Sequence, residues 1–493
     1  MEMQRKLRPV MFVGTSSDVG KSVITAGFCR VFKQDGYTPA PFKAQNMSLN
    51  SYATPEGLEI GRAQAVQAEA AGIPSHTDMN PVLLKPTTDK TSQVILNGKP
   101  AGNQTAQEYF KQGDRKVLFN EVEMAYGRLA ERYNPVVLEG AGSISELNLK
   151  HRDITNMRMA IAAGAVTYLV TDIDRGGIFA SLYGTMQLLQ PDERTCIKGI
   201  IINKFRGDPD LFLDGRKMIE DLCGVPVIGV LPYYRDIFIE EEDAVSLQQK
   251  HTKPIAGKVN VAVVLLGRMS NFTDFDRLDK DSRVNLYYTR TAAGITEADI
   301  VILPGSKNTI EDLIELKNNG LAAAVTSAYK TGKTVIGICG GYQMMGEIIK
   351  DPLQVESAAG EVTGLGLLPV LTTLTDKKTT RQINFTYRDY PENCRGYEIH
   401  MGKTEVVGTA QPSAVLADGG EDGYFLSSLC WGTYVHGILD NDVVINDLLA
   451  PYTDIKENNG DYQVYRNLQY DKLAKLLRNN LDIEQVYRHL SYL

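Results

Sequence analysis

The sequence has no excess of positive charge. Its 52 basic residues are outnumbered by 60 acidic ones, which gives a formal net charge of −8 over 493 residues. A protein whose main partner is a nucleic acid or an anionic membrane surface usually carries the opposite balance. We therefore expect neither partner, and an anionic ligand would have to be met by local cations.

Long apolar runs are also missing. No uninterrupted stretch reaches the ~18 residues that a transmembrane helix needs. Residues 1–14, MEMQRKLRPVMFVG, lead into a short apolar stretch bounded by glycine, which is more typical of a first strand than of a signal peptide. We expect a cytoplasmic protein without a membrane segment.

Cysteines are few and scattered. The six of them form no CxxC pair, which favours reduced thiols in a cytoplasm over a disulfide framework. One of the six remains available as a nucleophile. They are Cys29, Cys196, Cys223, Cys339, Cys394 and Cys430.

The composition is that of an ordinary globular protein. Hydrophobic residues make up 43% and charged residues 23%, which excludes a disordered chain. The length is about three times the ~150 residues of a typical domain. We therefore expect two or three domains, each with a core of normal size.

The first half alternates short apolar runs with helical stretches. The opening MFVG, a helix over 21–33 and continuous apolar runs at 136–140, 166–173, 199–204 and 225–232 are typical of parallel strands covered by helices on both faces. This order predicts an α/β domain over residues 1–247.

A polar segment rich in proline and glycine separates this half from a second α/β region. We expect a linker at 248–258 and a second domain over 259–493. Its strands are expected at 259–267, 298–305, 334–341 and 431–437, and a polar helical tail from about residue 470 closes the chain.

A phosphate-binding loop follows the first strand. Residues 14–22, GTSSDVGKS, form a loop of small residues that ends in Gly-Lys-Ser at a helix start, where backbone N–H groups and the helix dipole surround phosphate. Lys21 is expected to reach the β- and γ-phosphates of ATP, and the Ser22 hydroxyl to bind Mg²⁺. The residues of this predicted ATP site are Gly14, Thr15, Asp18, Gly20, Lys21 and Ser22.

The loop has one residue more than the usual P-loop, and this longer form resembles that of dethiobiotin synthetase and its relatives. In that group ATP phosphorylates a carboxylate or carbamate. Glu139, at the end of a strand, is the expected magnesium ligand, with Asp172 and Asp174 as rival or additional ones. Asn203 ends another strand at the ligand edge of the sheet, where it would read the adenine or cap the loop.

A cysteine in the second region lies on a strand-to-helix turn. Cys339 follows the apolar run TVIGI and precedes Gly340 and Gly341, which permit the strained backbone of a nucleophile elbow. The start of a helix lowers a thiol pKa and favours the thiolate. The N–H of Gly340 is placed to stabilise an oxyanion. We predict that Cys339 is a catalytic nucleophile.

A cysteine nucleophile needs a base, and His436 follows a short strand further along the chain. With this pair the region resembles the class I glutamine amidotransferases. The resemblance implies a second oxyanion donor in LPGSKNT, either Gly305 or Ser306. The acidic residue that commonly stands two positions after the histidine is replaced by Ile438, as in the cobyrinate-type subgroup. Glu398 and Asp440 are alternative partners for His436.

Together the two domains predict an amidation. A thioester at Cys339 would release ammonia from L-glutamine, and ATP would turn a substrate carboxylate into an acyl phosphate that ammonia displaces. Motifs over residues 9–448 resemble the cobyric acid synthase family. They are KAQNMSLNS (43–51), EIGRAQ (59–64), NPVLLKP (80–86), EGAGS (139–143), NLK (148–150) with RDI (152–154), DIDRGG (172–177) and GYEIHMG (396–402).

This resemblance implies a corrinoid substrate. In cobalamin biosynthesis the family amidates the b, d, e and g carboxylates of adenosylcobyrinic acid a,c-diamide. Cations and amides in the matching motifs suit a polycarboxylate that already carries amides. The residues expected to contact it are Lys43, Gln45, Asn46, Asn50, Arg62, Lys85, Asp153 and Arg175.

Two alternatives remain open. The first is an enzyme of the same chemistry with another substrate, the synthase of cobyrinic acid a,c-diamide. The second is a P-loop nucleotide switch that acts through partners, which Cys339 and His436 argue against because a switch has no use for a reactive thiol. The oligomeric state is not indicated by the sequence.

Overall fold

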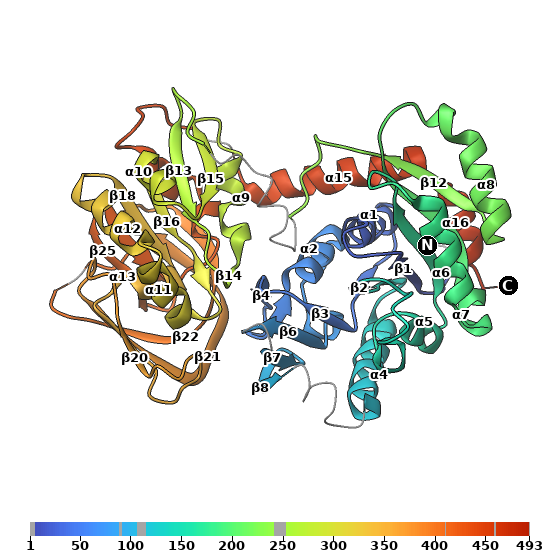
Figure 1. The fold of residues 1–493 in the computed structure, drawn as a ribbon, viewed down its shortest axis with the longest axis horizontal. Helices are drawn as coiled ribbons and strands as arrows, with labels where there is room; N and C mark the ends of the chain where they lie inside the picture. The colour runs from blue at the N-terminus through green and yellow to red at the C-terminus, as the bar shows by residue number, and fades with distance from the viewer. Residues whose placement is uncertain are drawn as a thin grey trace.

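The computed structural model describes residues 5–87, 91–105, 115–240, 253–409, 411–457 and 460–492. Two lobes, each built around a parallel β-sheet, lie side by side, and a long helix near the C-terminus runs along one edge of the molecule between them (Figure 1). We call residues 5–240 the first module and residues 253–457 the second module. The expected linker at 248–258 lies partly outside the described residues, and the predicted domain boundaries stay predictions.

The first module contains a parallel sheet in the order β12-β11-β10-β1-β9-β2. Alternate side chains of its continuous apolar strands enter two separate cores, one on each face. The strands are β1 (Val10–Gly14), β2 (Ala40–Phe42), β9 (Val136–Glu139), β10 (Val166–Asp172), β11 (Ile197–Phe205) and β12 (Val227–Pro232).

Helices cover both faces of this sheet. Helix α1 packs on one face, and helices α4, α5, α6 and α8 pack on the other. The helices of the first module are α1 (Lys21–Gln34), α2 (Arg62–Ala71), α4 (Arg115–Arg132), α5 (Met157–Ala163), α6 (Ile178–Leu188), α7 (Pro191–Cys196) and α8 (Leu213–Cys223).

Two small sheets extend the first module towards the second (Figure 1). Their strands follow β2 in the chain, starting in the polar segment after it, and β4 of the smaller sheet contacts the second module. Their strands are β3 (Gln45–Met47), β6 (Val82–Pro86), β7 (Thr91–Leu96) and β8 (Lys99–Thr105) in one sheet, and β4 (Ser51–Ala53) and β5 (Glu59–Gly61) in the other.

The second module repeats the layered plan. Its main sheet has the order β15-β13-β16-β18-β26-β25, parallel except for the edge strand β25. The strands are β13 (Val259–Val264), β15 (Val284–Thr289), β16 (Ile300–Leu303), β18 (Thr334–Ile338), β25 (Tyr424–Ser427) and β26 (Cys430–Thr433). The helices are α9 (Asp276–Asp279), α10 (Ala292–Glu297), α11 (Thr309–Asn318), α12 (Leu321–Lys330), α13 (Gly340–Met345) and α14 (Asp442–Leu449).

A long hairpin and short strands form a further sheet in the second module. Strands β21 (Val370–Tyr387) and β22 (Asn393–Val406) pair antiparallel, and β22 faces β4 of the first module. The other strands of this sheet are β19 (Ile348–Lys350), β20 (Glu361–Thr363), β23 (Ala414–Leu416) and β24 (Glu421–Asp422).

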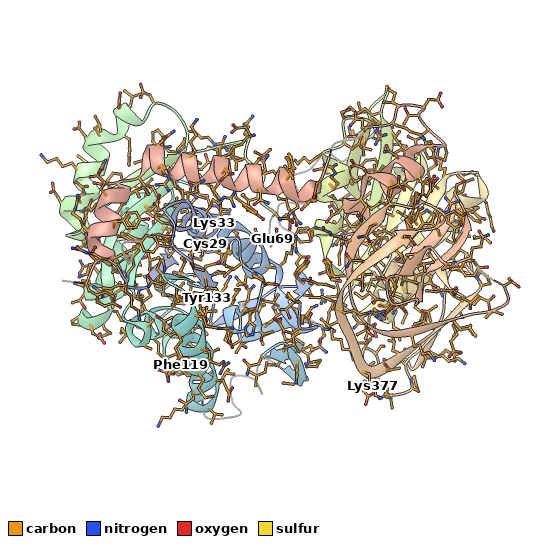
Figure 2. The ribbon with its side chains drawn as sticks, turned by 180° about the vertical axis from the view of Figure 1, so that it is seen from behind. Cys29, Lys33, Glu69, Phe119, Tyr133 and Lys377 are labelled. Atoms are coloured by element: carbon orange, nitrogen blue, oxygen red, sulfur yellow. The ribbon has the colours of Figure 1, made fainter. Side chains whose placement is uncertain are left out.

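The C-terminal helices are α15 (Tyr462–Asn480) and α16 (Ile483–Leu490). This tail was expected to belong to the second module, but both helices pack on the first. The buried side chains of Tyr470, Leu473 and Leu477 join the core formed by α1 and the first sheet, because that face offers the apolar surface they need. In Figure 2, Cys29 of α1 and Glu69 of α2 lie beneath the long helix.

The fold class expected from the sequence is confirmed. Both expected parallel sheets are present, and the predicted strands differ from the observed ones by a few residues at their ends. None of the helices in the described ranges combines the length and the apolar character that crossing a bilayer requires.

The contact between α1 and α15 gives a stability prediction. A methyl group added at Gly27 would lie 2.5 Å from Leu477 Cδ1, whereas one added at Gly127 in α4 would meet nothing within 4 Å. Helix propensity favours alanine over glycine by ~1 kcal/mol. We expect Gly127→Ala to raise the free energy of unfolding, measured in urea, and Gly27→Ala to lower it by ~1–3 kcal/mol through overpacking. Equal stabilisation by both would show that α15 is not held against α1.

Candidate functional site

Three segments singled out from the sequence meet at one edge of the second sheet. Gly305 follows β16, Cys339 follows β18 and His436 follows β26, and these three strands are parallel neighbours. The carboxyl ends of parallel strands share one edge of a sheet, which is where α/β proteins place their ligands. The topology therefore brings the predicted nucleophile, base and oxyanion loop together.

Cys339 lies on a strained turn. Its backbone has φ 53° and ψ −109°, a conformation that L-residues rarely adopt, directly before α13. Only glycine fits at Gly341 behind it, since a Cβ there would lie 1.9 Å from the carbonyl oxygen of Leu303. Cys339 is 7% exposed, and its thiol donates a hydrogen bond to Ile399 O at 3.7 Å. This geometry is that of the predicted nucleophile elbow.

The glycine loop after β16 faces this elbow. A Cβ added at Gly340 would lie 2.8 Å from the backbone nitrogen of Ser306, so the two peptide segments are in close contact. A Cβ at Gly305 would lie 3.3 Å from His436 Cε1. Peptide groups of this loop and of Gly340 therefore lie close together beside the elbow, where an oxyanion hole would need its N–H donors. The predicted donors, Gly340 and Gly305 or Ser306, remain candidates.

His436 is fully buried and is held by a carboxylate that the sequence analysis missed. His436 Nδ1 lies 2.7 Å from Asp274 Oδ2, and the backbone N–H of Gly437 donates to Asp274 Oδ1 at 2.9 Å. Burial lowers the pKa of His436, but the Asp274 carboxylate outweighs it, with Cys339 acting in the same direction, and this pKa is raised to about 10. The ring of Tyr397 stacks on His436 with 5.2 Å between centroids.

Asp274 therefore takes the place for which Glu398 and Asp440 were considered. Glu398 pairs with Arg381 instead and lies 3.5 Å from His400 Nε2. A signal for Asp274 was present in the sequence. It stands shortly after β13, whose carboxyl end lies at the same sheet edge as those of β16 and β18.

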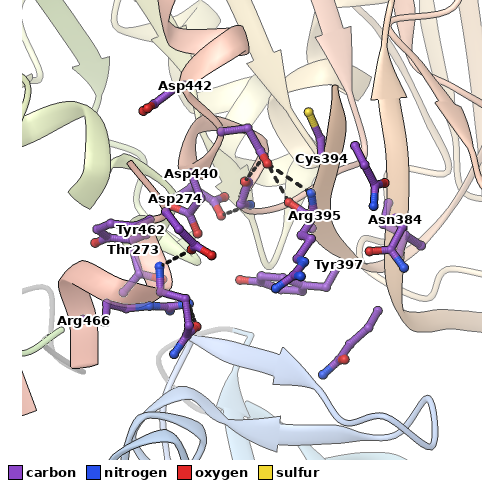
Figure 3. A pocket seen from close by; sticks show the side chains of 18 of the residues that line it. Thr273, Asp274, Asn384, Cys394, Arg395, Tyr397, Asp440, Asp442, Tyr462 and Arg466 are labelled. Atoms are coloured by element: carbon purple, nitrogen blue, oxygen red, sulfur yellow. Dashed lines mark hydrogen bonds between the residues drawn. The ribbon is translucent and has the colours of Figure 1, made fainter. Parts of the chain in front are cut away.

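A cavity of about 540 Å³ lies behind this pair, at the boundary between the modules (Figure 3). Asp274, Tyr397 and Asp440 from the second module line it together with Arg62 from the first and Arg466 from α15. Burial raises the pKa of Asp440 to about 7. The far side of the His436–Asp274 pair thus borders a polar space that both modules share.

The second candidate site is the loop after β1 in the first module. Gly20 has φ 99°, and a Cβ there would lie 2.2 Å from Asn203 Nδ2, so the position requires glycine. Lys21 Nζ donates to the carbonyl oxygens of Ser16 at 2.9 Å and Gly142 at 3.0 Å. The lysine therefore curls over the loop where phosphate would lie.

Glu139 is buried beside the start of α1. Its carboxylate accepts hydrogen bonds from Ser22 Oγ at 2.8 Å, Lys43 Nζ at 2.9 Å and Gln67 Nε2 at 2.6 Å. Burial raises the pKa of Glu139, but Lys43 and the hydrogen bonds outweigh burial, so the net pKa is lowered and the group stays ionised. A hydroxyl and an ionised carboxylate side by side are donors that suit Mg²⁺.

The other polar residues of this edge surround the same loop. Asp172 Oδ2 lies 2.9 Å from Lys204 Nζ, and Asp174 pairs with Arg206 at 2.6 Å. Asn203 Nδ2 donates to the carbonyl oxygen of Val19 at 2.8 Å, which is the capping alternative of the sequence analysis. Two further candidates lie beside them: Thr15 is partly buried and its Oγ1 donates to Thr171 Oγ1 at 3.2 Å, and Asp18 is exposed and lies 3.6 Å from Arg175.

Comparison with known proteins assigns both modules. Residues 10–246 match the family described as "CobQ/CobB/MinD/ParA nucleotide binding domain", and residues 260–444 match "CobB/CobQ-like glutamine amidotransferase domain".

Cobyric acid synthase of Parabacteroides distasonis is 59% identical over 99% of this chain and 100% of its own length, and that of Bacteroides fragilis is 59% identical over 99% of both chains. Cobyric acid synthase of Salmonella heidelberg is 46% identical over 97% of both. The chain belongs to the cobyric acid synthase family. The resemblance seen in the sequence is thus confirmed, and the chain is a glutamine-dependent ligase.

Several cations that the family resemblance assigned to the corrinoid already have carboxylate partners in the structure. Lys43 pairs with Glu139, Arg62 Nε donates to Glu240 at 2.6 Å, and Lys85 Nζ lies 2.8 Å from Glu59. Arg175 is 62% exposed and lies 3.8 Å from Asp172.

Of the polar candidates from the same motifs, Asn50 contacts the second module, and the others lie within the first. Asp153 accepts from the backbone N–H of Thr155 at 2.8 Å, and Asn46 donates to Gln64 at 3.0 Å, so both have structural contacts within the first module. Gln45 begins β3. Asn50, by contrast, reaches the second module and accepts from the backbone N–H of Phe272 at 3.1 Å.

The His436–Asp274 contact predicts that Asp274→Asn lowers the kcat of glutamine hydrolysis by about 100-fold or more, because the wrong ring tautomer is then favoured. The matched control is Asp440→Asn in the same cavity. Its carboxyl has a pKa of about 7 and is partly protonated at neutral pH, so the amide resembles it and kcat should hold. A loss in Asp440→Asn without a loss in Asp274→Asn would assign the orienting role to Asp440.

Proposed function

We propose that this protein amidates the b, d, e and g carboxylates of adenosylcobyrinic acid a,c-diamide, with ATP as the energy source and L-glutamine as the nitrogen donor. One observation carries the proposal. A strained Cys339 elbow with a buried His436–Asp274 pair adjoins a P-loop module whose Ser22–Glu139 pair suits a magnesium nucleotide. The identity to cobyric acid synthases over the whole chain supports the choice of substrate.

The glutaminase half-reaction uses groups of the second module. His436 Nε2 takes the proton of the Cys339 thiol, and the thiolate attacks the carboxamide carbon of glutamine. The N–H of Gly340 and an N–H of the 305–306 loop hold the resulting oxyanion. His436 then protonates the departing nitrogen, which leaves as ammonia, and water hydrolyses the thioester to release glutamate and restore the thiol. Asp274 holds the ring in the tautomer that this sequence needs.

The ligase half-reaction uses the first module. The backbone of residues 14–20 surrounds the phosphates of ATP and Lys21 moves from the loop carbonyls onto the β- and γ-phosphates. Ser22 and Glu139 would hold Mg²⁺, which when bound neutralises phosphate charge. A corrinoid carboxylate attacks the γ-phosphorus and ADP leaves. Ammonia then attacks the acyl carbon of the acyl phosphate and expels phosphate, leaving the amide.

Activation by ATP answers a chemical need. A carboxylate is a poor electrophile with a poor leaving group, and phosphorylation corrects both defects. Ammonia that stays within the protein also avoids protonation to ammonium, which has no lone pair for the attack. Two catalytic modules in contact on one chain are what such a transfer requires.

The nucleophile prediction separates the two halves of the reaction. We expect Cys339→Ala to abolish glutamine-dependent amidation and to retain amidation with added ammonium salt, both followed by amide formation. The matched control is Cys430→Ala. Burial raises the pKa of Cys430 to about 12, so this thiol is inert and glutamine-dependent activity should persist. Loss of both activities in Cys339→Ala would contradict a role confined to glutamine hydrolysis.

The substrate prediction is tested by the mass of the product, because each amidation changes it by a fixed amount. Incubation with ATP, glutamine and the a,c-diamide should yield a product with four new amides, and Lys21→Ala should yield none while retaining some glutamine hydrolysis. Amidation of cobyrinic acid alone, with the a,c-diamide left unchanged, would overturn the proposed substrate in favour of a,c-diamide synthesis.

A further inference from the structure

Strand β22 holds His436 through both its backbone and an aromatic side chain. The backbone N–H of Tyr397 donates to His436 O at 3.0 Å, and the N–H of His436 donates to Tyr397 O at 2.8 Å. The Tyr397 ring stacks on the imidazole with 5.2 Å between centroids and 22° between ring planes. Because the backbone bonds do not depend on the side chain, the stacked ring can be changed while the strand keeps its place beside His436.

The imidazole under this ring is charged. His436 Nδ1 lies 2.7 Å from Asp274, and with a pKa of about 10 the ring is protonated at neutral pH. A cation within ~6 Å of an aromatic centroid is attracted by the negative face of the ring, most strongly where water is excluded. His436 is fully buried and Tyr397 is 6% exposed. The stack therefore favours the charged form of His436 over the neutral one.

Other charged and polar groups reach His436 from neighbouring elements. Asp274 follows β13, and Cys339 on the elbow raises the histidine pKa in the same direction. Asn271 Nδ2 lies 3.2 Å from Nε2, and Asp440 lines the cavity together with Asp274. Asp274 and Asn271 meet the nitrogen atoms at the edge of the imidazole, whereas the tyrosine covers its face. The contribution of Tyr397 is therefore separate from theirs.

The first module packs against this tyrosine. Tyr52 lies on Tyr397 with 4.7 Å between centroids and 62° between ring planes, and the Arg62 guanidinium lies 4.7 Å from the centre of the Tyr52 ring. Arg62 is paired with Glu240, so its charge is balanced on that side. The Tyr397 ring is thus held between Tyr52 and the imidazole.

We infer that Tyr397 is a positioning residue that stabilises the imidazolium form of His436 through its stacked ring. The inference rests on the proposed function, because it concerns the histidine that serves Cys339 in glutamine hydrolysis. The charged ring stabilises a thiolate at Cys339 and holds the proton that the departing ammonia takes. Tyr397 keeps that proton on His436 to a higher pH.

The test measures kcat/KM for glutamine hydrolysis by the full chain as a function of pH. Tyr397→Leu removes the aromatic face and keeps an apolar side chain. The pKa of His436 should then fall, so the alkaline limb of the profile should move to lower pH by about one unit, as expected for a desolvated cation that loses its ring. Tyr397→Phe keeps the face, and its alkaline limb should stay at the wild-type position.

Tyr390→Leu is the matched control. Tyr390 lies between the two strands of the same hairpin and stacks on Tyr387 with 5.9 Å between centroids, so it loses a comparable contact away from His436. Its alkaline limb should not move. An unmoved limb in Tyr397→Leu would overturn the inference. An equal shift in Tyr397→Phe would assign the effect to the hydroxyl, and an equal shift in Tyr390→Leu to a loosened hairpin, and either result would also overturn it.

The protonation of His436 can also be followed directly. In protein with ¹⁵N-labelled histidine and no substrate, the His436 imidazole signal, assigned by its loss in His436→Gln, should titrate about one unit lower in Tyr397→Leu than in the wild type. An equal midpoint in the two proteins would contradict the role of the ring. If the proposed function were wrong, the wild-type protein would release no glutamate from glutamine, whereas this titration needs no turnover and tests the stack in either case.

Discussion

The buried carboxylate of Asp274 is the constraint on which the second site depends. An ionised group at this depth is tolerated only with its hydrogen bonds satisfied and a positive partner nearby. Its two oxygens meet His436 Nδ1 and the N–H of Gly437, so one side chain ties the loop after β13 to the end of β26. Without that carboxylate, burial would keep His436 neutral with a lowered pKa, as in an ordinary core histidine. With Asp274 present, the His436 ring can hold a positive charge, and a positive ring is what stabilises a thiolate at Cys339.

The boundary between the modules is built from buried charges. Glu59 of the first module pairs with Lys85 and, across the boundary, with Lys378 of the long hairpin, while Arg62 and Arg466 share Glu240. Buried ion pairs contribute more to a specific arrangement than to net stability, because desolvation offsets much of their attraction. Beside these pairs, Tyr52 of the first module packs against Tyr397 of the second with 4.7 Å between ring centroids, so the boundary combines charged and aromatic contacts.

The sequence predicted the features that depend on local pattern. Continuous apolar runs indicated the parallel strands. The spacing of glycines indicated the elbow at Cys339 and the phosphate-binding loop before Lys21, because such turns need particular residues at fixed offsets. Asp274 was missed because its role comes from tertiary contact: it is one acidic residue among many in a loop, and only the order of strands brings it to His436. The tail was placed on the wrong module for the same reason, since a mostly polar helix does not indicate which surface covers its few apolar side chains.

The cations that the family resemblance assigns to the corrinoid are already paired in the first module. Lys43, Arg62 and Lys85 already rest on buried carboxylates, so a corrinoid carboxylate can reach them only by displacing Glu139, Glu240 or Glu59. Each displacement would leave a buried carboxylate in need of another cation, which for Glu139 a magnesium ion can supply. Ser51 shares Lys85 with Glu59, and its backbone N–H donates to Asn271 Oδ1 of the second module, so this pair lies next to the boundary. The cations of the first module thus have internal partners close to the boundary, where Lys378 of the second module also pairs with Glu59.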